Sequence, residues 1–272
     1  MKRLSPFIAV VLVSVFATLG TVAGVHYARG TSNQRTNAPA TTALGVGTQQ
    51  ISESTLATAP NGAENDFAAV YAAVRPSIVE IDTAGQGGRR RPRQVQGQGS
   101  GVVLDLKGHI LTNEHVVTGA QTITVTFADD STASATVVGT DAADDLAVIT
   151  TSATQSELHP ATLGDSGALK VGDLVAAVGN PFGLKGSLST GVISGLDRTF
   201  TDASGQTGQQ GLLQVDAAVN EGSSGGGLFD MRGELVGITS ALENPDTSTF
   251  AGVGYAVPID IVKQVMQQLL GG

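Results

Sequence analysis

The strongest constraint on the fold is a long series of short segments rich in Val, Ile and Thr, each bounded by Gly, Asp or Asn. Ten such segments follow one another from residue 101 onward, among them QTITVTFAD, SLSTGVISG and GELVGITSA. Strand-like runs joined by turn residues, with no helical segments between them, are typical of antiparallel barrels or a sandwich. About two hundred residues of this kind are enough for two small barrels. We therefore predict barrels at roughly residues 77–160 and 170–257.

Two segments have helical rather than strand-like spacing. An apolar repeat at residues 67–74 ends at Pro76, just before a predicted strand at residues 77–83. The residues of that repeat are Phe67, Val70, Tyr71 and Val74. Residues 258–270 start with a proline suited to a helix start, and we expect this C-terminal helix to pack onto a barrel. Its apolar face consists of Ile261, Val262, Val265, Met266, Leu269 and Leu270.

Residues 1–27 are predicted to be a membrane anchor or signal segment. Two basic residues precede an uncharged apolar run at residues 7–25, which approaches the ~20 residues needed to cross a bilayer. The basic flank predicts that the rest of the chain lies outside the cytoplasm. Because the run is longer than an ordinary signal-peptide core, we favour an uncleaved single anchor over a cleaved signal, and its position at the N-terminus behind two cations disfavours a buried core helix. Thr21 and Ala23 leave a cleaved signal and a secreted protein as the alternative.

Residues 28–65 are predicted to be a disordered linker, because they are rich in Thr, Ala, Asn, Gln, Gly and Ser and hold few large apolar side chains. Such a segment cannot bury enough surface to offset the entropy lost on ordering.

Charge and composition exclude several function classes. The formal net charge of −9 argues against a nucleic-acid partner, which requires a basic field. The chain has no cysteine, so disulfides, thiolate metal sites and cysteine nucleophiles are excluded. We expect neither a metal nor a cofactor. The 36 glycines and few aromatic residues agree with short strands joined by tight turns.

The stretch VNEGSSGGGLFD, residues 219–230, combines two adjacent serines with four glycines directly after an apolar strand-like run. A phosphate-binding loop is disfavoured, because the lysine and following Ser or Thr of that motif are missing. A linker is disfavoured because strongly apolar segments flank the stretch. The remaining interpretation is a serine nucleophile, which needs a base and backbone donors for the oxyanion, and glycines allow backbone N–H groups to turn toward one point.

A base and an orienting acid are available elsewhere in the chain. Among the four histidines, His115 ends the apolar run ILTNEHVV, where a base could be held firmly. By itself, a histidine at such a position is more often a packed core residue. Asp145 opens the next buried run, DLAVIT, with Asp144 as its rival for the acid role. The order His, Asp, Ser is one of the orders found in catalytic triads, that of chymotrypsin.

Five segments in the same order resemble the HtrA/Deg family of trypsin-like serine proteases, over roughly residues 66–270. They are GSGVVLDLKGHILTNEHVV, DDLAVI, VGNPFGLKGSLSTGVISGLDR, LLQVDAAVNEGSSGGGL and GVGYAVPID. The resemblance implies an all-β fold of two six-stranded antiparallel β-barrels of the chymotrypsin type with a C-terminal helix.

The resemblance also assigns candidate roles. It implies that Ser224 is the nucleophile, His115 the general base and Asp145 the carboxylate that orients it. The oxyanion-hole candidates are Gly222, Ser223 and Ser224, with the N–H groups of Gly222 and Ser224 as donors. The substrate-binding candidates are Ala218, at the base of the primary pocket, and a substrate-pairing strand at residues 237–242, with Gly237, Ile238, Thr239 and Ser240.

Two positions depart from the usual family pattern. Glu221 stands where the family usually has proline, and Ser223 where it has asparagine. Neither change removes a catalytic group, but a misaligned oxyanion hole would cost ~10² to 10³ in rate.

The resemblance implies unfolded polypeptide substrates, cleavage after small or medium aliphatic residues, and a role in protein quality control and the stress response in the cell envelope. It also implies a homo-oligomer, as a trimer. Many members carry a C-terminal PDZ domain, which we do not expect within these 272 residues, either because this member lacks one or because its chain is longer.

Two other function classes compete with this interpretation. One is a catalytically weak, chaperone-like or peptide-binding module on the same fold, and the presence of His115, Asp145 and Ser224 favours the enzyme over it. The other is an esterase of a different fold, which would place the acid and the histidine after the serine, the reverse of the order here.

Overall fold

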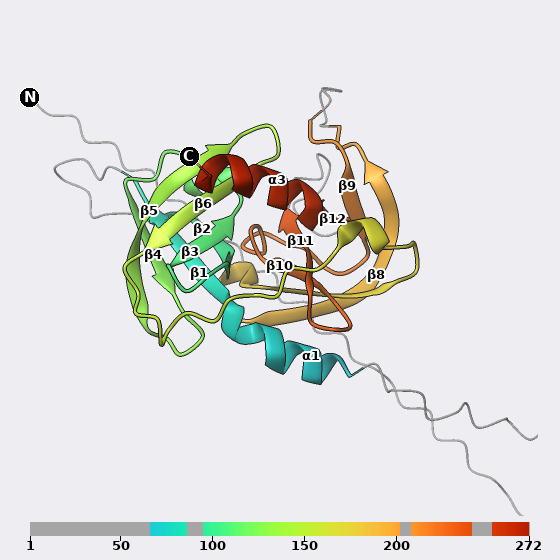
Figure 1. The fold of residues 1–272 in the computed structure, drawn as a ribbon, viewed down its shortest axis with the longest axis horizontal. Helices are drawn as coiled ribbons and strands as arrows, with labels where there is room; N and C mark the ends of the chain where they lie inside the picture. The colour runs from blue at the N-terminus through green and yellow to red at the C-terminus, as the bar shows by residue number, and fades with distance from the viewer. Residues whose placement is uncertain (1–65, 86–94, 202–207, 241–251, 272) are drawn as a thin grey trace, which may run out of the picture. The chain divides into compact units, whose positions relative to one another are not determined.

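The computed structural model describes residues 66–85, 95–201, 208–240 and 252–271. The predicted anchor and linker lie outside these ranges. Twelve strands in the described residues form two closed antiparallel barrels (Figure 1). This confirms the prediction of two six-stranded antiparallel barrels over that of a sandwich.

The first barrel has the strand order β1-β2-β3-β6-β5-β4. Its strands are β1 (Ile78–Ala84), β2 (Val95–Val103), β3 (His109–Thr112), β4 (Thr122–Thr126), β5 (Thr132–Asp141) and β6 (Leu146–Thr151). A single helical turn, α2 (Glu114–Val117), follows β3 and carries His115.

The second barrel has the order β10-β11-β12-β9-β8-β7. Its strands are β7 (Leu174–Gly179), β8 (Ser187–Arg198), β9 (Leu212–Val215), β10 (Gly227–Asp230), β11 (Leu235–Ser240) and β12 (Gly254–Pro258). The short 3-10 turns η2 (Ser166–Ala168) and η3 (Pro181–Gly183) precede β7 and β8 respectively.

Helices stand at both ends of the described chain, as the apolar repeats predict. Helix α1 (Phe67–Val74) begins at Asp66, whose carboxylate accepts the N–H of Ala69 at 2.9 Å, and continues into the 3-10 turn η1 (Arg75–Ser77) at Pro76. Helix α3 (Ile259–Leu270) buries Val262 and Val265 and packs on strands of both barrels.

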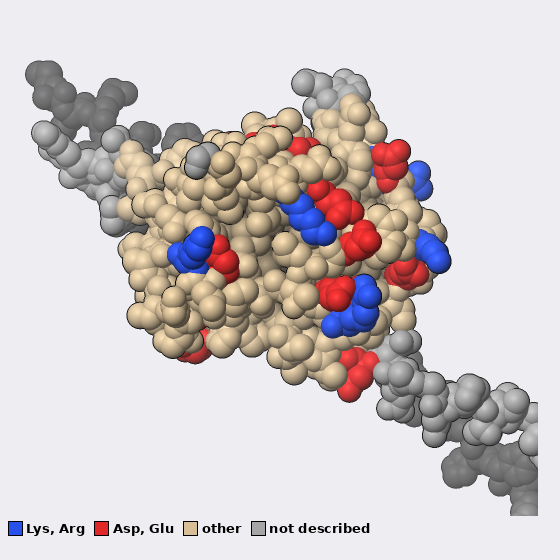
Figure 2. Space-filling model, in the orientation of Figure 1, with Lys and Arg blue, Asp and Glu red and all other residues tan. Residues whose placement is uncertain are grey.

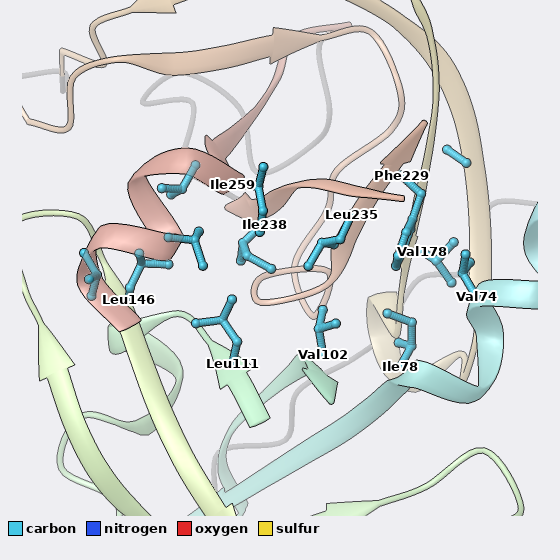
Figure 3. Packing of buried hydrophobic residues seen from close by; sticks show 14 of the residues in the cluster. Val74, Ile78, Val102, Leu111, Leu146, Val178, Phe229, Leu235, Ile238 and Ile259 are labelled. Carbon is cyan, nitrogen blue, oxygen red and sulfur yellow. The ribbon is translucent and has the colours of Figure 1, made fainter. Parts of the chain in front are cut away.

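The two barrels share a hydrophobic core (Figure 3). Ile78, Val102 and Leu111 of the first barrel and Phe229 and Ile238 of the second belong to one buried cluster, each exposed by no more than 1%. Each barrel also has a smaller cluster of its own. Burial of apolar surface stabilises a fold by about 25 cal/mol per Å². The shared core therefore holds the two barrels together in one arrangement, and a site built from residues of both barrels depends on that arrangement.

Charged side chains of both signs lie next to one another on the face drawn in Figure 2. Among the ion pairs of the described residues, Arg232 pairs with Asp230 at 2.9 Å and Lys263 with Asp260 at 3.1 Å. On this face there is no extended basic field of the kind that binds phosphate groups. None of the helices in the described residues is long and apolar enough to cross a membrane.

Candidate active site

His115 lies on α2, directly after β3, and its side chain is about half exposed. Its Nδ1 lies 2.9 Å from Oδ1 and 2.8 Å from Oδ2 of Asp145, and its backbone N–H donates to the same Oδ1 at 3.0 Å. The structure therefore brings together the histidine and the carboxylate proposed from sequence, 30 residues apart. With Nδ1–H donating to the carboxylate, Nε2 is left as the basic nitrogen.

Asp145 adopts an unusual backbone conformation that aims its carboxylate at His115. Its φ is +50°, in the left-handed region that Asp tolerates better than most residues. Its carbonyl accepts the N–H of Glu114 at 3.1 Å and the Nδ2–H of Asn113 at 2.8 Å. These two bonds connect the start of α2 to Asp145, so the histidine and the carboxylate are fixed by backbone as well as by side chain.

A residue of the second barrel also contacts this carboxylate. The hydroxyl of Ser240, at the end of β11, donates to Oδ2 of Asp145 at 3.2 Å. The side chain of Asp145 is only 13% exposed, so the donors of His115 and Ser240 satisfy carboxylate oxygens that have little access to water.

Asp144, the rival acid, faces a different neighbour. Its backbone N–H donates to Asp141 Oδ1 at 3.2 Å, and burial together with the negative charge of Asp141 raises the pKa of the Asp144 carboxyl. The structure thus separates the two adjacent aspartates, with Asp145 toward the histidine.

Ser224 is buried, at 4% exposure, in the loop between β9 and β10, and its segment packs directly on the first barrel. The carbonyl of Ser224 accepts the N–H of Ser100, on β2, at 2.8 Å. At Gly225 φ is +83°, and a Cβ there would lie 2.2 Å from the Ser100 carbonyl oxygen and 2.3 Å from Thr112 Oγ1. Only glycine allows this approach of the two barrels.

A second glycine on β2, Gly99, is in contact both with α2, which carries His115, and with the loop that carries Ser224. A Cβ at Gly99 would lie 2.7 Å from Cγ1 of Val116, the residue after His115, and 3.3 Å from the carbonyl oxygen of Ser224. The segments that carry His115 and Ser224 are therefore neighbours across the barrel interface.

Residues 220–225, which we call the serine turn, have each of their first five carbonyl groups bound by a donor. The pairs are Asn220 O with Ser223 N–H (2.8 Å), Glu221 O with Phe182 N–H (3.1 Å), Gly222 O with Ser100 Oγ–H (2.7 Å), Ser223 O with Thr239 Oγ1–H (2.7 Å) and Ser224 O with Ser100 N–H (2.8 Å). Gly222 has a φ of +86° at the third position of a turn closed from Asn220 to Ser223, as a type II turn requires. The turn is held rigidly before any substrate binds.

These anchors determine where the amides of Gly222 and Ser224 point. In a trans peptide the C=O and N–H groups point in opposite directions. Because Phe182 binds the Glu221 carbonyl, the Gly222 N–H points away from Phe182. Because Thr239 binds the Ser223 carbonyl, the Ser224 N–H points away from Thr239. The N–H of Ser223 itself is used within the turn, so Ser223 does not serve as an oxyanion donor in this conformation.

Neither departure from the family pattern disturbs the turn. Glu221 is exposed and takes part through its backbone carbonyl. The Ser223 hydroxyl lies 3.4 Å from the N–H of Asn220, within the turn itself.

Ala218 lines a cavity of about 260 Å³ between β7, β8 and the serine turn. Its backbone N–H donates to Ser189 Oγ at 2.7 Å. The neighbouring Val219 faces the other way, since its Cγ2 would lie 2.9 Å from a Cβ at Gly254 of β12. None of the described residues that line this cavity has a charged side chain: the lining consists of Ala177, Val178, Gly179, Pro181, Ser187, Leu188, Ser189, Ala218, Asn220, Ser223 and Thr239.

The expected substrate-pairing strand, residues 237–242, needs a correction over residues 237–239, and residues 241 and 242 lie outside the described ranges. Gly237 and Ile238 pair with β10 on one side and with β12 on the other, and Thr239 bonds through its backbone to Gly225, Gly226 and β12. An interior strand has no unpaired edge to offer a peptide. Ser240 is the last residue of β11, and it pairs with Tyr255 of β12 but not with β10. Among the four residues, Ser240 is therefore the one placed where a substrate strand could start to pair with β11.

The described residues contain no group of three or more His, Asp or Glu side chains arranged to hold a metal ion. Sequence reasoning missed Ser100 and Asn180, which contact the serine turn and its supporting loop. Both lie in quoted motifs, GSG and GNPFG, whose flanking glycines were the only signal.

Comparison with known proteins agrees with this geometry. The family model described as a trypsin-like peptidase domain matches residues 99–238. The chain is 46% identical over 175 residues to Protease Do-like 1, chloroplastic, of Arabidopsis thaliana, which is 64% of this chain and 40% of the relative. It is 41% identical over 173 residues to a probable periplasmic serine endoprotease, DegP-like, of Buchnera aphidicola, covering 63% of this chain and 36% of the relative.

Solved structures show the same likeness. The HtrA-type protease AlgW with a tripeptide superimposes with a TM-score of 0.65 at 33% identity, over 74% of this chain and 62% of that chain. The chain spans 33% to 59% of the length of the curated relatives with which it is compared. The family model, these relatives and the two-barrel fold agree, and the chain belongs to the HtrA/Deg family of trypsin-like serine proteases.

Proposed function

We propose that the protein is a serine endopeptidase in which Ser224, His115 and Asp145 act together. The Ser224 oxygen attacks a peptide carbonyl while its proton passes to Nε2 of His115. The tetrahedral intermediate collapses as the C–N bond breaks and the imidazolium returns the proton to the leaving amine. Water then attacks the acyl-enzyme by the same route, releasing the acid and restoring the serine. Asp145 keeps the imidazole in the required tautomer and stabilises its protonated form.

The N–H groups of Gly222 and Ser224 are the oxyanion donors in this proposal. The anchored carbonyls of Glu221 and Ser223 support it, since they direct both amides away from the core contacts of the turn. Donors that are already oriented need no reorganisation when charge develops, which is why such groups contribute strongly to catalysis.

The observation that carries the proposal is the contact of His115 with Asp145 at 2.8 Å beside a serine turn that is bound to the same barrel. A chaperone-like module has no need for an oriented imidazole next to a rigid serine turn.

A fluorophosphonate probe tests the proposal directly, because it labels only serines that a base activates. We expect one adduct per chain, located by mass spectrometry on the peptide that contains Ser224, and no adduct with heat-denatured protein. An unlabelled native protein, or an adduct at another serine, would contradict the assignment.

We propose cleavage after small or medium aliphatic residues. The described residues that line the cavity beside Ala218 offer aliphatic, hydroxyl and amide groups to a substrate side chain, and none of them is a carboxylate that could bind Lys or Arg. We expect kcat/KM for a peptide cleaved after valine to exceed that for its arginine analogue by at least about tenfold. A peptide library profiled by mass spectrometry measures this, and preference for basic residues would refute it.

We also propose that the protease acts outside the cytoplasm on unfolded polypeptides, held by an anchor at residues 1–27, and that it works as a homo-oligomer, a trimer. The apolar run behind two basic residues supports the anchor, and a relative named as periplasmic supports the location. Protease accessibility in spheroplasts tests the location, and sedimentation analysis tests the trimer.

A further inference from the structure

The hydroxyl of Ser100 is a fully buried group that connects three parts of the molecule. Ser100 lies on β2 of the first barrel and has an exposure of 0%. Its Oγ donates to the carbonyl of Gly222 at 2.7 Å and accepts the backbone N–H of Asn180 at 2.8 Å. The Nδ2 of Asn180 lies 3.3 Å from the same oxygen.

The direction of the Ser100 proton follows from its partners. A hydroxyl has one donor and two acceptor positions. Both groups of Asn180 are N–H donors, so they occupy the acceptor positions, and the single proton must go to Gly222. This hydroxyl therefore has no alternative arrangement, and Gly222 has a fixed partner for its carbonyl.

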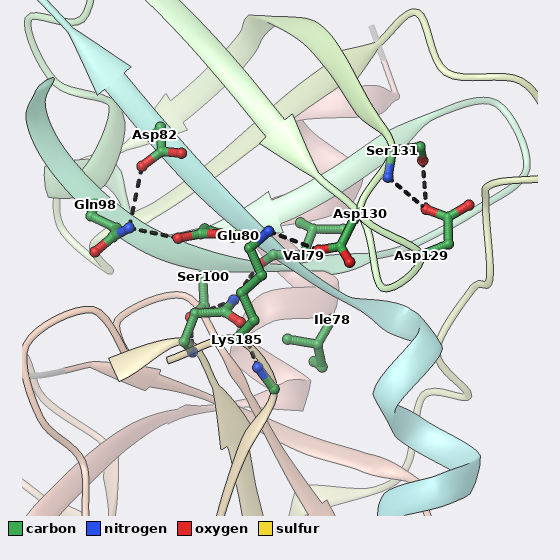
Figure 4. A network of polar contacts seen from close by, with 12 residues as sticks. Ile78, Val79, Glu80, Asp82, Gln98, Ser100, Asp129, Asp130, Ser131 and Lys185 are labelled. Carbon is green, nitrogen blue, oxygen red and sulfur yellow. Dashed lines mark hydrogen bonds and ion pairs between the residues drawn. The ribbon is translucent and has the colours of Figure 1, made fainter. Parts of the chain in front are cut away.

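Asn180 is itself held in place, which makes Ser100 part of a rigid support. Asn180 is 1% exposed, its Nδ2 donates to the carbonyl of Val79 at 2.8 Å, and its Oδ1 accepts the N–H of Gly186 at 2.8 Å. Figure 4 shows Val79 on β1 and Ser100 on β2, two residues of the first barrel that bind Asn180, and Lys185, in the loop after η3, pairs with Asp130 of the first barrel at 2.9 Å. The support of the serine turn thus extends from β1 and β2 into the second barrel.

Ser100 also binds the other side of the nucleophile, because its backbone N–H donates to the carbonyl of Ser224. One residue therefore holds the carbonyl groups of both Gly222 and Ser224. We infer that the Ser100 hydroxyl is a positioning group for the oxyanion hole. It holds Gly222 through its carbonyl, and it holds Asn180, two residues before the Phe182 N–H that binds the Glu221 carbonyl and so sets the direction of the Gly222 N–H. This inference rests on the proposed endopeptidase function.

Removal of the hydroxyl leaves two buried groups without a partner, the carbonyl of Gly222 and the N–H of Asn180. An unpaired buried polar group is costly, and rotation of the 222–223 peptide is the nearest way to relieve that cost. Such a rotation breaks the bond from the Ser223 N–H to the Asn220 carbonyl that closes the turn, and it thereby releases the Glu221–Gly222 peptide, which carries the Gly222 N–H. Because oxyanion donors act mainly in the transition state, the loss falls on kcat rather than on KM.

The test compares Ser100→Ala with Ser166→Ala, which removes a similarly buried hydroxyl bound to the N–H of Asp260 at the start of α3. Kinetics are measured on a chromogenic valine peptide, labelling rates with the fluorophosphonate probe, and Tm by circular dichroism. For Ser100→Ala we expect kcat and the labelling rate to fall about 10- to 100-fold, with KM changed less than about threefold. For Ser166→Ala we expect unchanged kcat.

Other outcomes are equally informative. Full kcat in folded Ser100→Ala refutes the positioning role, and so does a change confined to KM or to Tm. If Ser100→Ala does not fold, Ser100→Cys takes its place, since a thiol of similar reach is a weak donor, and the same fall in kcat is expected. A wild-type protein that neither hydrolyses the peptide nor takes the label refutes both this inference and the proposed function.

Discussion

Replacement of Ser224 by alanine is expected to lower the hydrolysis of fluorescent casein by about 10⁴-fold or more, because removal of the nucleophile removes the acyl-enzyme route. The fold should persist. The carbonyl of Ser224 accepts the N–H of Ser100 on β2, and Gly225 packs closely against β2 because it has no Cβ. The substitution of the Ser224 side chain changes neither contact. We therefore expect Tm to change by only a few degrees while activity falls to background.

Ser166→Ala is the matched control for this experiment, because it deletes one buried hydroxyl with the same change in atoms. The control should hydrolyse casein at the wild-type rate. Retention of more than a few per cent of activity in Ser224→Ala, after contaminating proteases are excluded by purification from a protease-deficient host, would contradict the assignment of the nucleophile.

The architecture could be predicted from sequence because its signals are local. The apolar repeats at residues 67–74 and 258–270 predict α1 and α3 to within one or two residues, since periodicity of 3.6 has no other simple cause. The strands were recognisable because each short apolar run is bounded by turn residues.

The parts that escaped prediction depend on pairings between distant residues. Ser100 and Gly222 are separated by 122 positions, and nothing in either segment alone indicates that a hydroxyl will meet a carbonyl there. The interior position of residues 237–239 of the expected substrate-pairing strand escaped prediction for the same reason. Strand β11 is apolar whether it is interior or at an edge, and only the pairing of Gly237 and Ile238 with both β10 and β12 shows that it is interior.

The choice between Asp144 and Asp145 shows where pattern reasoning stops. Strand alternation predicts that adjacent side chains face opposite ways, but it does not say which of the two faces the histidine. The answer lies in a backbone conformation, φ of +50° at Asp145, that interrupts the alternation directly before β6. Residues with uncommon backbone conformations are frequently found at active sites.

Asp145→Asn is the second change with a large expected effect, a fall in kcat of about 10⁴-fold. The carboxylate accepts three donors: Nδ1–H and the backbone N–H of His115, and the Ser240 hydroxyl. An amide offers one acceptor oxygen and an NH₂ group. With the NH₂ facing Nδ1, His115 must carry its proton on Nε2, where it can no longer receive the proton of Ser224.

Asp144→Asn is the matched control, one position earlier in the chain and with the same loss of one negative charge. The Asp144 carboxyl has a pKa raised by burial and by Asp141, and no hydrogen bond to it from His115 is found in the described structure. We expect kcat within about twofold of wild type for this variant, against the ~10⁴-fold loss for its neighbour. Two adjacent, chemically identical substitutions with such different outcomes would show that orientation of the imidazole, rather than negative charge in this region, supports catalysis. The reverse result would assign the acid to Asp144, and equal losses would point to a general effect of charge.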